Sequence, residues 1–234
     1  CDAVEQILRR RRGEFVRTWI VTDAVFSMDG HLAPLAQLCD LAEQYDATVI
    51  VDEAHGTGVF GHSGSGLCEE LGVKDRVPVR IGTLSKAIGS QGGFVAGPAV
   101  VTDYLINRCR SLIYSTALAP PAVAAASEAI DLITGQPERR LHLHQLAQRV
   151  REGLSIQVEP VERRGPIIPV PMGADRAAVV ASERLAEAGF FVPAIRPPTV
   201  PEGGARLRIS LSAAHDEPMV DALVAAIHDI KSHP

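Results

Sequence analysis

The sequence predicts an α/β fold in which a mainly parallel sheet is followed by a smaller α+β region. In residues 1–137, runs rich in Val and Ile alternate with segments of helical periodicity, as in parallel sheets covered by helices. In residues 138–234, helices alternate with strand-like runs bounded by turns rich in Pro and Gly. This second pattern is typical of hairpin-like strands with helices on one side. We therefore expect two domains, 1–137 and 138–234.

Four strand-like runs are predicted in the first region, at residues 18–26, 47–54, 77–85 and 92–97. Continuous Val and Ile in 47–54 indicates a strand that is covered on both faces. A helical pattern opens the chain at 2–11, and Pro34 begins a second helix with Leu35 and Leu38 on its apolar face. A longer helix is expected to begin at Pro120 and Pro121. The strand–helix–strand order indicates largely parallel pairing.

The second region is expected to begin after a hinge at 135–137. Helices are predicted at residues 139–154, 174–189 and 217–230, and strands at 166–172, 190–195 and 205–212, with a Pro-rich turn over 196–204. Helices and antiparallel strands in this order form a small α+β domain.

Composition excludes several classes of protein. Hydrophobic residues make up 46% and charged residues 22% of the 234 residues, as in soluble globular proteins. The formal net charge of −5 argues against a nucleic-acid partner, and no apolar run is long enough to span a bilayer. No signal peptide is recognisable, and the four cysteines lack metal-ligand spacing. We expect a cytoplasmic protein with reduced thiols, no metal and no membrane partner.

Three polar side chains fall at or just past predicted strand ends, where open α/β sheets bind ligands. Asp52 ends a hydrophobic strand, His55 follows it in AHGTG, and Lys86 lies in the loop TLSKAIGSQGG. A carboxylate can hold a pyridine nitrogen protonated, and a lysine amine can form a Schiff base. Together they are the minimum protein equipment for pyridoxal phosphate chemistry. We therefore predict Asp52, His55 and Lys86 as catalytic, cofactor-binding residues.

Each of these residues also has a structural interpretation. Asp52 alone can cap a turn or pair with an arginine, and a lone histidine is more often structural than catalytic. Lys86 alone can be a surface lysine, but among the three lysines of the chain it alone has glycine-rich flanks. The combination favours the functional interpretation. The glycines after His55 do not have the spacing of a dinucleotide-binding loop, so no nucleotide site is expected there.

Further hydroxyl and cationic groups are candidates for binding. Thr83 and Ser85, beside Lys86, can hold phosphate oxygens. Ser27 can bond to the cofactor or cap the next turn. Arg196 can clamp a substrate carboxylate, with Thr199 in the same turn, or it is a surface arginine. Ser115 and Thr116 precede the Pro120 helix, where they contact phosphate or cap the helix.

Taken together, four blocks of sequence resemble the α-oxoamine synthases, pyridoxal phosphate enzymes of fold type I. The blocks are VFSMDGHLAPL, VDEAHGTGVFG, GTLSKAIGSQGGFVAG and AIRPPTVPEGGARLRISLSAAH. The last block is most similar to the family member of biotin biosynthesis. The resemblance implies that 1–137 is the C-terminal part of the cofactor-binding large domain and 138–234 the small domain. It also implies that the family's N-terminal part is lacking here, and that Asp23 and His31 depart from the usual residues.

The resemblance assigns a role to each candidate residue. It implies that Lys86 carries the Schiff base, Asp52 pairs with the pyridine nitrogen and His55 lies near the ring oxygen. Ser27 and Thr83 are then cofactor contacts, and Arg196 binds the amino-acid carboxylate with Thr199 nearby. The family works as homodimers, so Ser115 and Thr116 are expected to reach the partner subunit's phosphate.

The implied reaction condenses an amino acid with an acyl thioester and releases CO2 and the thiol. By resemblance the substrates are L-alanine and pimeloyl-CoA, or its carrier-protein equivalent. Two alternatives remain. One is a sister activity on glycine or serine, like 2-amino-3-ketobutyrate CoA ligase or serine palmitoyltransferase. The other is a truncated, non-catalytic chain that keeps the fold.

Overall fold

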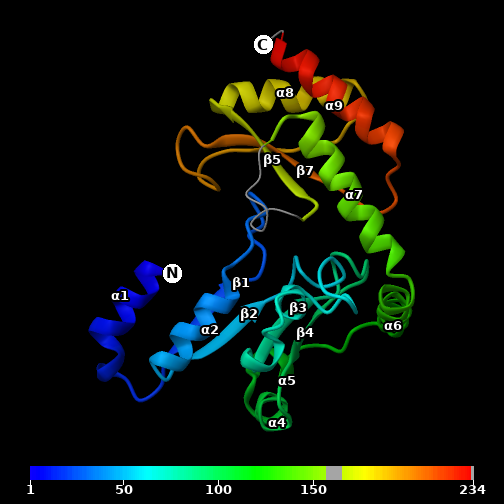
Figure 1. The fold of residues 1–234 in the computed structure, drawn as a ribbon. Coiled ribbons are helices and arrows are strands. Elements are labelled where there is room, and N and C mark those ends of the chain that lie inside the picture. Colours follow the sequence, from blue (N-terminus) through cyan, green and yellow to red (C-terminus); the bar gives the residue numbers. More distant parts are fainter. Residues whose placement is uncertain (157–164, 233–234) are drawn as a thin grey trace. The chain divides into compact units, whose positions relative to one another are not determined.

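The computed structural model describes residues 1–156 and 165–232, and these form two compact units. The first unit contains Cys1–Val25 and Ala33–Pro137, and the second contains Phe26–Leu32 and Glu138–Pro234 (Figure 1). The seven-residue segment Phe26–Leu32 thus belongs with the C-terminal half of the chain, which the sequence pattern does not indicate. The assignment of the first unit to a cofactor-binding large domain and of the second unit to a small domain stays a prediction.

The first unit contains a four-stranded sheet in the order β1-β2-β3-β4. Its strands are β1 (Trp19–Asp23), β2 (Thr48–Asp52), β3 (Val79–Thr83) and β4 (Gly93–Ala96). The first three pair in parallel and β4 pairs antiparallel to β3. The expectation of a largely parallel sheet is confirmed. β4 is the exception because only a short loop separates it from β3, and parallel strands need a longer crossover.

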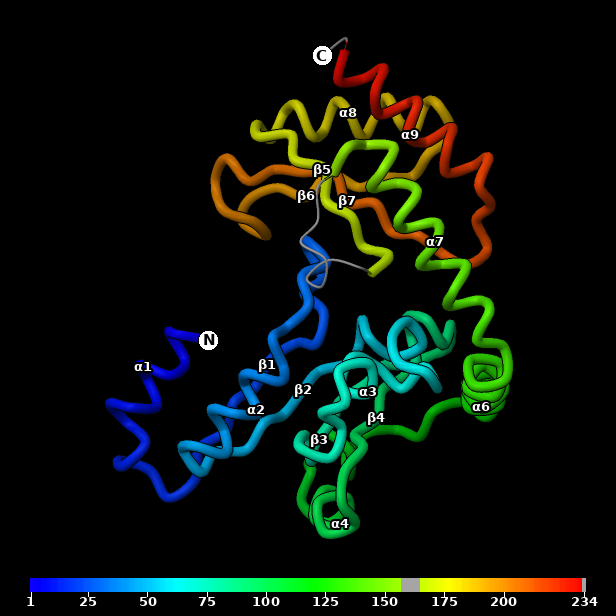
Figure 2. Tube along the Cα trace, in the orientation of Figure 1, coloured from blue at the N-terminus to red at the C-terminus, as the bar shows by residue number. Residues whose placement is uncertain are grey.

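α2 (Leu35–Gln44) connects β1 to β2 and covers one face of the sheet (Figure 2). It begins directly after Pro34, as predicted, and buries Leu35, Leu38, Cys39 and Ala42. Across the interface, Val49 and Val51 of β2 are buried. This apolar contact fixes the strand whose end carries Asp52.

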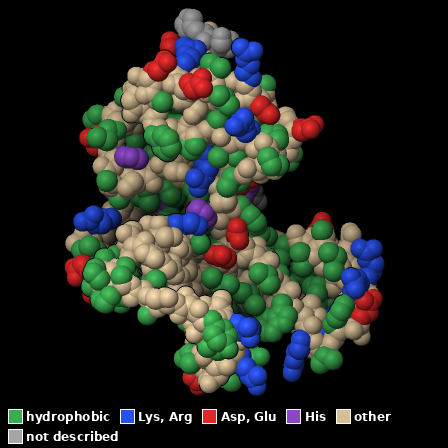
Figure 3. Space-filling view, turned by 180° about the vertical axis from the view of Figure 1, so that it is seen from behind, with side chains coloured by type: hydrophobic (Ala, Val, Ile, Leu, Met, Phe, Trp, Pro, Cys, Tyr) green, Lys and Arg blue, Asp and Glu red, His purple; other side chains and the backbone are tan. Residues whose placement is uncertain are grey.

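The opposite face of the sheet is only partly covered by the described residues. Trp19 is 55% and Val21 67% exposed, and Ile81 on β3 is exposed on the same face. Apolar side chains are visible on the first unit from the side opposite that of Figure 1 (Figure 3). The Val and Ile content of β2 predicts a strand that is covered on both faces. In the structure, only the face of β2 that packs against α2 is fully covered.

The other helices of the first unit are α1 (Asp2–Arg11), α3 (Leu67–Glu70), α4 (Ala99–Arg108), α5 (Arg110–Ile113) and α6 (Pro120–Gly135), with 3-10 turns at Arg12–Glu14 and Lys74–Arg76. The sequence predicts α1 and α6 but not the three between them. α4 and α5 bury no residue, and α3 and α5 have only four residues each, which is too short to show helical periodicity.

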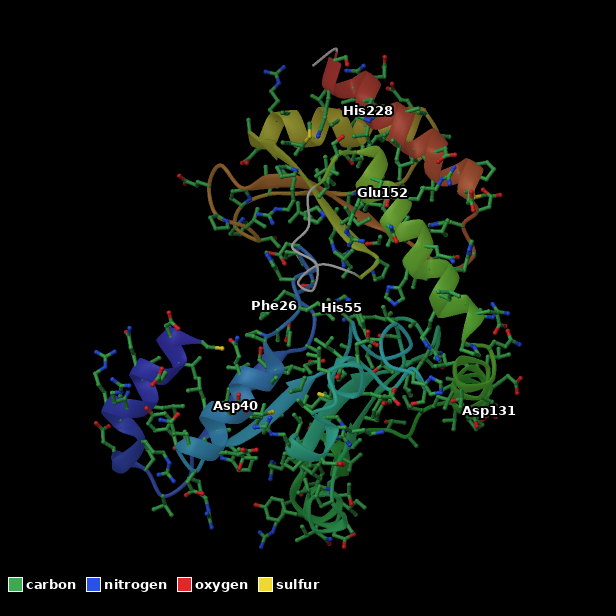
Figure 4. The ribbon with its side chains drawn as sticks, viewed as in Figure 1. Phe26, Asp40, His55, Asp131, Glu152 and His228 are labelled. Carbon is green, nitrogen blue, oxygen red and sulfur yellow. The ribbon has the colours of Figure 1, made fainter. Side chains whose placement is uncertain are left out.

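The second unit is an antiparallel sheet covered by three helices. Its strands, in the order β5-β7-β6, are β5 (Ile167–Gly173), β7 (Ala205–Ser210) and β6 (Ala194–Ile195). The helices are α7 (Glu138–Gly153), α8 (Asp175–Glu187) and α9 (Glu217–Ser232). Leu185, Leu207 and Ile227 belong to its buried core. His228 on α9 bonds the carbonyl of Gly153 at 2.8 Å and so ties α9 to α7 (Figure 4).

The predicted strand at 190–195 is mostly irregular, since only Ala194 and Ile195 pair with β7. Pro193 lacks an N–H and so cannot donate to a ladder, although its carbonyl accepts the N–H of Arg208. Phe191 is 93% exposed. None of the described helices is sufficiently long and apolar to cross a membrane.

Candidate functional site

The central contact of the candidate site joins Lys86 to His55. The Nζ of Lys86 and the Nε2 of His55 are 2.9 Å apart. The two residues follow neighbouring parallel strands, β3 and β2, whose carboxyl ends meet at one edge of the sheet. His55 lies in the loops at that edge (Figure 4). A hydrogen bond of this kind needs a lone pair on one nitrogen, so the contacting pair carries at most one positive charge.

The loop that carries Lys86 is held by its own backbone. The Leu84 N–H donates to the Gly92 carbonyl, the Ser90 N–H donates to the Leu84 carbonyl, and the Gly89 N–H donates to the Lys86 carbonyl. The Ser90 hydroxyl donates to the carbonyl of Ala122 on α6 at 2.6 Å. Lys86 itself is exposed in this chain. The amine therefore stands on a fixed backbone while remaining accessible.

Thr83 and Ser85 present their hydroxyls together beside Lys86. Their oxygens are 2.8 Å apart, and the Ser85 N–H donates to the Thr83 hydroxyl. The Thr83 hydroxyl also donates to the Gly92 carbonyl at 3.1 Å. Two hydroxyls and an adjacent backbone N–H form a polar group that suits phosphate or ring oxygens.

Asp52 ends β2 and is half-buried, with one carboxylate oxygen accepting the Ala54 N–H at 2.8 Å. This bond fixes the turn that leads to His55. The second carboxylate oxygen of Asp52 can accept a further, charge-assisted hydrogen bond from a protonated ring nitrogen.

Asp23 lies next to Asp52 because the two residues are in register across the parallel pair β1–β2. Partial desolvation and then the charge of Asp52 raise the pKa of Asp23, while the charge of Lys86 lowers it. In the sequence, Asp23 is distinguished only as a departure from the residue usual in the family. The strand predicted at 18–26 continues past Asp23, so the sequence did not indicate that Asp23 ends β1 beside Asp52.

Ser27, Arg196 and Thr199 lie in the second unit. The Ser27 carbonyl accepts a bond from the Nε of Arg208, which fixes the segment Phe26–Leu32 to β7. Arg196 and Thr199 are exposed in one turn, where the Thr199 N–H donates to the Arg196 carbonyl at 3.1 Å. The structure thus brings Asp52, His55, Thr83, Ser85 and Lys86 together in the first unit. Ser27, Arg196 and Thr199 belong to the second unit.

Arg208 is a candidate that sequence analysis missed. The pKa of the Arg208 guanidinium is lowered, and burial is the single cause of this shift. The alternation of ARLRIS predicts Arg206 and Arg208 on the face of β7 opposite the buried Leu207, and this alternation was the available signal.

Ser115 and Thr116 are exposed in the segment between α5 and α6. α6 has Ala119 at its N-cap and no side-chain cap. The interpretation of either hydroxyl as a simple helix cap is therefore wrong. The Pro-led start needs no such cap, because proline lacks one of the N–H groups that a cap would satisfy.

Comparison with known proteins identifies the family of the chain. The model of the family "Aminotransferase class I and II" matches residues 1–227. The chain belongs to this family. A curated relative from Anaeromyxobacter dehalogenans strain 2CP-C, named 8-amino-7-oxononanoate synthase, is 48% identical over 98% of this chain and 58% of its own length. The predicted resemblance and the fold-type I architecture are thereby confirmed.

Solved structures support the same family. Serine palmitoyltransferase of Sphingomonas wittichii is 31% identical with a TM-score of 0.90, over 97% of this chain and 59% of its own. The 8-amino-7-oxononanoate synthase of Francisella tularensis is 25% identical with a TM-score of 0.78, over 97% and 67%. The chain spans 57–58% of the length of these curated relatives.

The residues fit a pyridoxal phosphate cofactor by the chemistry of their donors and acceptors. An accessible amine, a carboxylate with a free acceptor position, an imidazole and two paired hydroxyls occur at one sheet edge. These groups match an aldehyde, a pyridine nitrogen, a ring oxygen and a phosphate. The fit rests on residues from β2, β3 and the loops after them.

Asp23 makes stability depend on pH. Because its pKa is raised above the ordinary 3.8, its charged form is disfavoured in the folded state. We expect Asp23→Asn to raise the melting temperature at pH 7 and to lose that gain as the pH falls below about 4, where the wild-type carboxyl is protonated in both states.

Thermal unfolding monitored between pH 3 and pH 8 measures this effect. Asp103→Asn on the exposed side of α4 removes one negative charge away from the site and serves as the control. A loss of stability at pH 7 in Asp23→Asn would instead mean that attraction by Lys86 outweighs desolvation and repulsion.

Proposed function

We propose that the protein catalyses the decarboxylative condensation of L-alanine with a pimeloyl thioester. The products are 8-amino-7-oxononanoate, CO2 and the CoA or carrier-protein thiol, and the pathway served is biotin biosynthesis. The observation that carries the proposal is the 2.9 Å contact between Lys86 and His55 beside Asp52, in a chain 48% identical to a protein named for this reaction.

Lys86 has two tasks in this function. Its amine would hold the cofactor, and the same amine would remove the substrate's α-proton and return it. His55 accepts or donates a proton at Nε2 and so keeps the Lys86 amine available as a base. The exposed position of Lys86 on a rigid loop suits a group that must meet a substrate.

Asp52 would accept the hydrogen bond of the pyridine nitrogen and so stabilise its protonated form. When bound, pyridoxal phosphate supplies an electron sink for the carbanion formed at the substrate's α-carbon. Thr83 and Ser85 hold cofactor oxygens with their hydroxyls, and Ser27 contributes a further cofactor contact. Thr116 binds the phosphate of a partner subunit's cofactor.

Arg196 binds the amino-acid carboxylate with two parallel N–H donors, and Thr199 supports it from the same turn. A carboxylate held at this point is oriented for loss as CO2 after the new carbon–carbon bond forms. Support comes from the exposed position of both side chains and from the bond between their backbones.

The protein acts in the cytoplasm as a homodimer in this proposal. Large apolar side chains are exposed on α4, α5 and α6 of the first unit, among them Tyr104, Ile113 and Ile130, and Tyr114 directly after α5 is exposed too. An apolar surface of this extent favours association.

A second candidate function is condensation of serine with a long-chain acyl thioester. It is favoured by the TM-score of 0.90 to serine palmitoyltransferase of Sphingomonas wittichii. Turnover of L-alanine, glycine and L-serine with pimeloyl-CoA and palmitoyl-CoA separates the candidates. The higher identity to curated 8-amino-7-oxononanoate synthases favours the alanine and pimeloyl pair.

Lys86→Ala is expected to abolish both turnover and covalent attachment of pyridoxal phosphate, because no other group at this sheet edge supplies an amine. Borohydride reduction followed by peptide mass spectrometry measures the attachment. The control is Lys74→Ala, since Lys74 is exposed and its amine lies 3.5 Å from the Ser65 hydroxyl. Retention of normal turnover in Lys86→Ala would refute the assignment.

Arg196→Ala is expected to raise KM for L-alanine by about tenfold to a hundredfold, the cost of losing a charge-assisted carboxylate contact of about 1.5–3 kcal/mol. The KM for pimeloyl-CoA should change much less. Initial-rate kinetics with each substrate varied measures both values. Arg176→Ala, an exposed arginine on α8, is the control. Equal effects of the two variants would exclude Arg196 from the carboxylate site.

A further inference from the structure

Glu53 is a buried carboxylate to which the proposed reaction assigns no task. It follows Asp52 directly and, because side chains alternate along an extended chain, it faces the opposite side. Only 2% of its surface is exposed. A buried carboxylate is stable only when hydrogen bonds compensate for its lost hydration, so its partners show what it holds in place.

The Glu53 side chain accepts two backbone N–H groups of α3. Oε2 accepts the Leu67 N–H at 2.9 Å, and Oε1 accepts the Cys68 N–H at 2.7 Å. The Glu53 carboxylate packs directly against the backbone of Gly56 and Gly66, where a larger side chain would collide with it. A Cβ added at Gly56 would lie 1.9 Å from Oε2, and one at Gly66 would lie 2.5 Å from it.

The backbone of Glu53 fixes two further elements. Its N–H donates to the Ile81 carbonyl of β3 at 2.7 Å, and its carbonyl accepts the N–H groups of Gly56 and Thr57, both at 2.8 Å. His55 lies inside the turn closed by these last two bonds. One residue therefore connects α3, β3 and the turn of His55.

We propose that Glu53 is a positioning residue that sets the place of the His55 imidazole and thereby maintains the contact of His55 with Lys86. The carboxylate anchors the turn to α3 from one side, and β3, which leads to Lys86, anchors it from the other. The part of this inference that concerns catalysis rests on the proposed function. The part that concerns the position of His55 does not.

A purely structural carboxylate provides the contrast. Glu69 accepts bonds from the N–H and hydroxyl groups of Ser63 and Ser65. Burial alone would raise the pKa of Glu69, but these hydrogen bonds outweigh it and lower the pKa. Glu69 belongs to α3, like the partners of Glu53, yet these bonds anchor residues 63 and 65 rather than the turn of His55. Glu69→Gln is therefore the matched control.

The test compares Glu53→Ala, Glu53→Gln and Glu69→Gln in the full-length protein. The first measurement is the ring-nitrogen NMR signal of His55 without cofactor, assigned with His55→Gln among the eight histidines of the chain. We expect a large change in Glu53→Ala, a smaller one in Glu53→Gln, which keeps one acceptor oxygen, and little change in Glu69→Gln. Thermal unfolding of all three variants reports the accompanying loss of stability.

The second measurement is the rate at which pyridoxal phosphate attaches to Lys86, followed by borohydride trapping. Displacement of a positioned group by about 1 Å can reduce a rate by about a hundredfold, so we expect a fall of at least about tenfold in Glu53→Ala. Glu53→Gln should recover most of this rate. Glu69→Gln should match the wild type.

The inference is overturned if Glu53→Ala loses stability while its His55 signal and attachment rate equal those of Glu69→Gln. If Glu53→Ala does not fold, Glu53→Gln decides the question with the same two measurements. If the wild type attaches no pyridoxal phosphate, the proposed function fails, and the His55 signal alone still supports or refutes the positioning role.

Discussion

Parallel pairing of β1, β2 and β3 is the constraint on which the candidate site depends. Parallel strands end at the same edge of a sheet, so residues far apart in sequence meet there. Asp23 and Asp52 come together through the register of β1 and β2, and Lys86 reaches His55 from the end of β3. A shift of one residue in β2 would turn Asp52 to the opposite face.

Two adjacent carboxylates at the end of β2, Asp52 and Glu53, have different roles. Asp52 keeps an acceptor position open and is half-buried, whereas Glu53 is buried and its carboxylate accepts two backbone N–H groups of α3. Alternation along the strand separates them onto opposite sides. One carboxylate is thus available to a ligand while the other holds the turn between the strand and His55.

The two units contribute residues of different chemical character. The first supplies the amine, the imidazole and the carboxylates, and the second supplies arginines at and beside β7.

The sequence by itself determined the strands of the first unit and the Pro-led helices, and it predicted Asp52, His55 and Lys86 as site residues. These signals are local, because β-branched runs, proline and glycine act within a few residues. Only the tertiary structure decided the antiparallel direction of β4, the place of Asp23 beside Asp52 and the partners of Glu53. It also decided that Phe26–Leu32 belongs to the second unit. The physical reason is that register, burial and long-range hydrogen bonds depend on which segments pack together, and local sequence does not encode that choice.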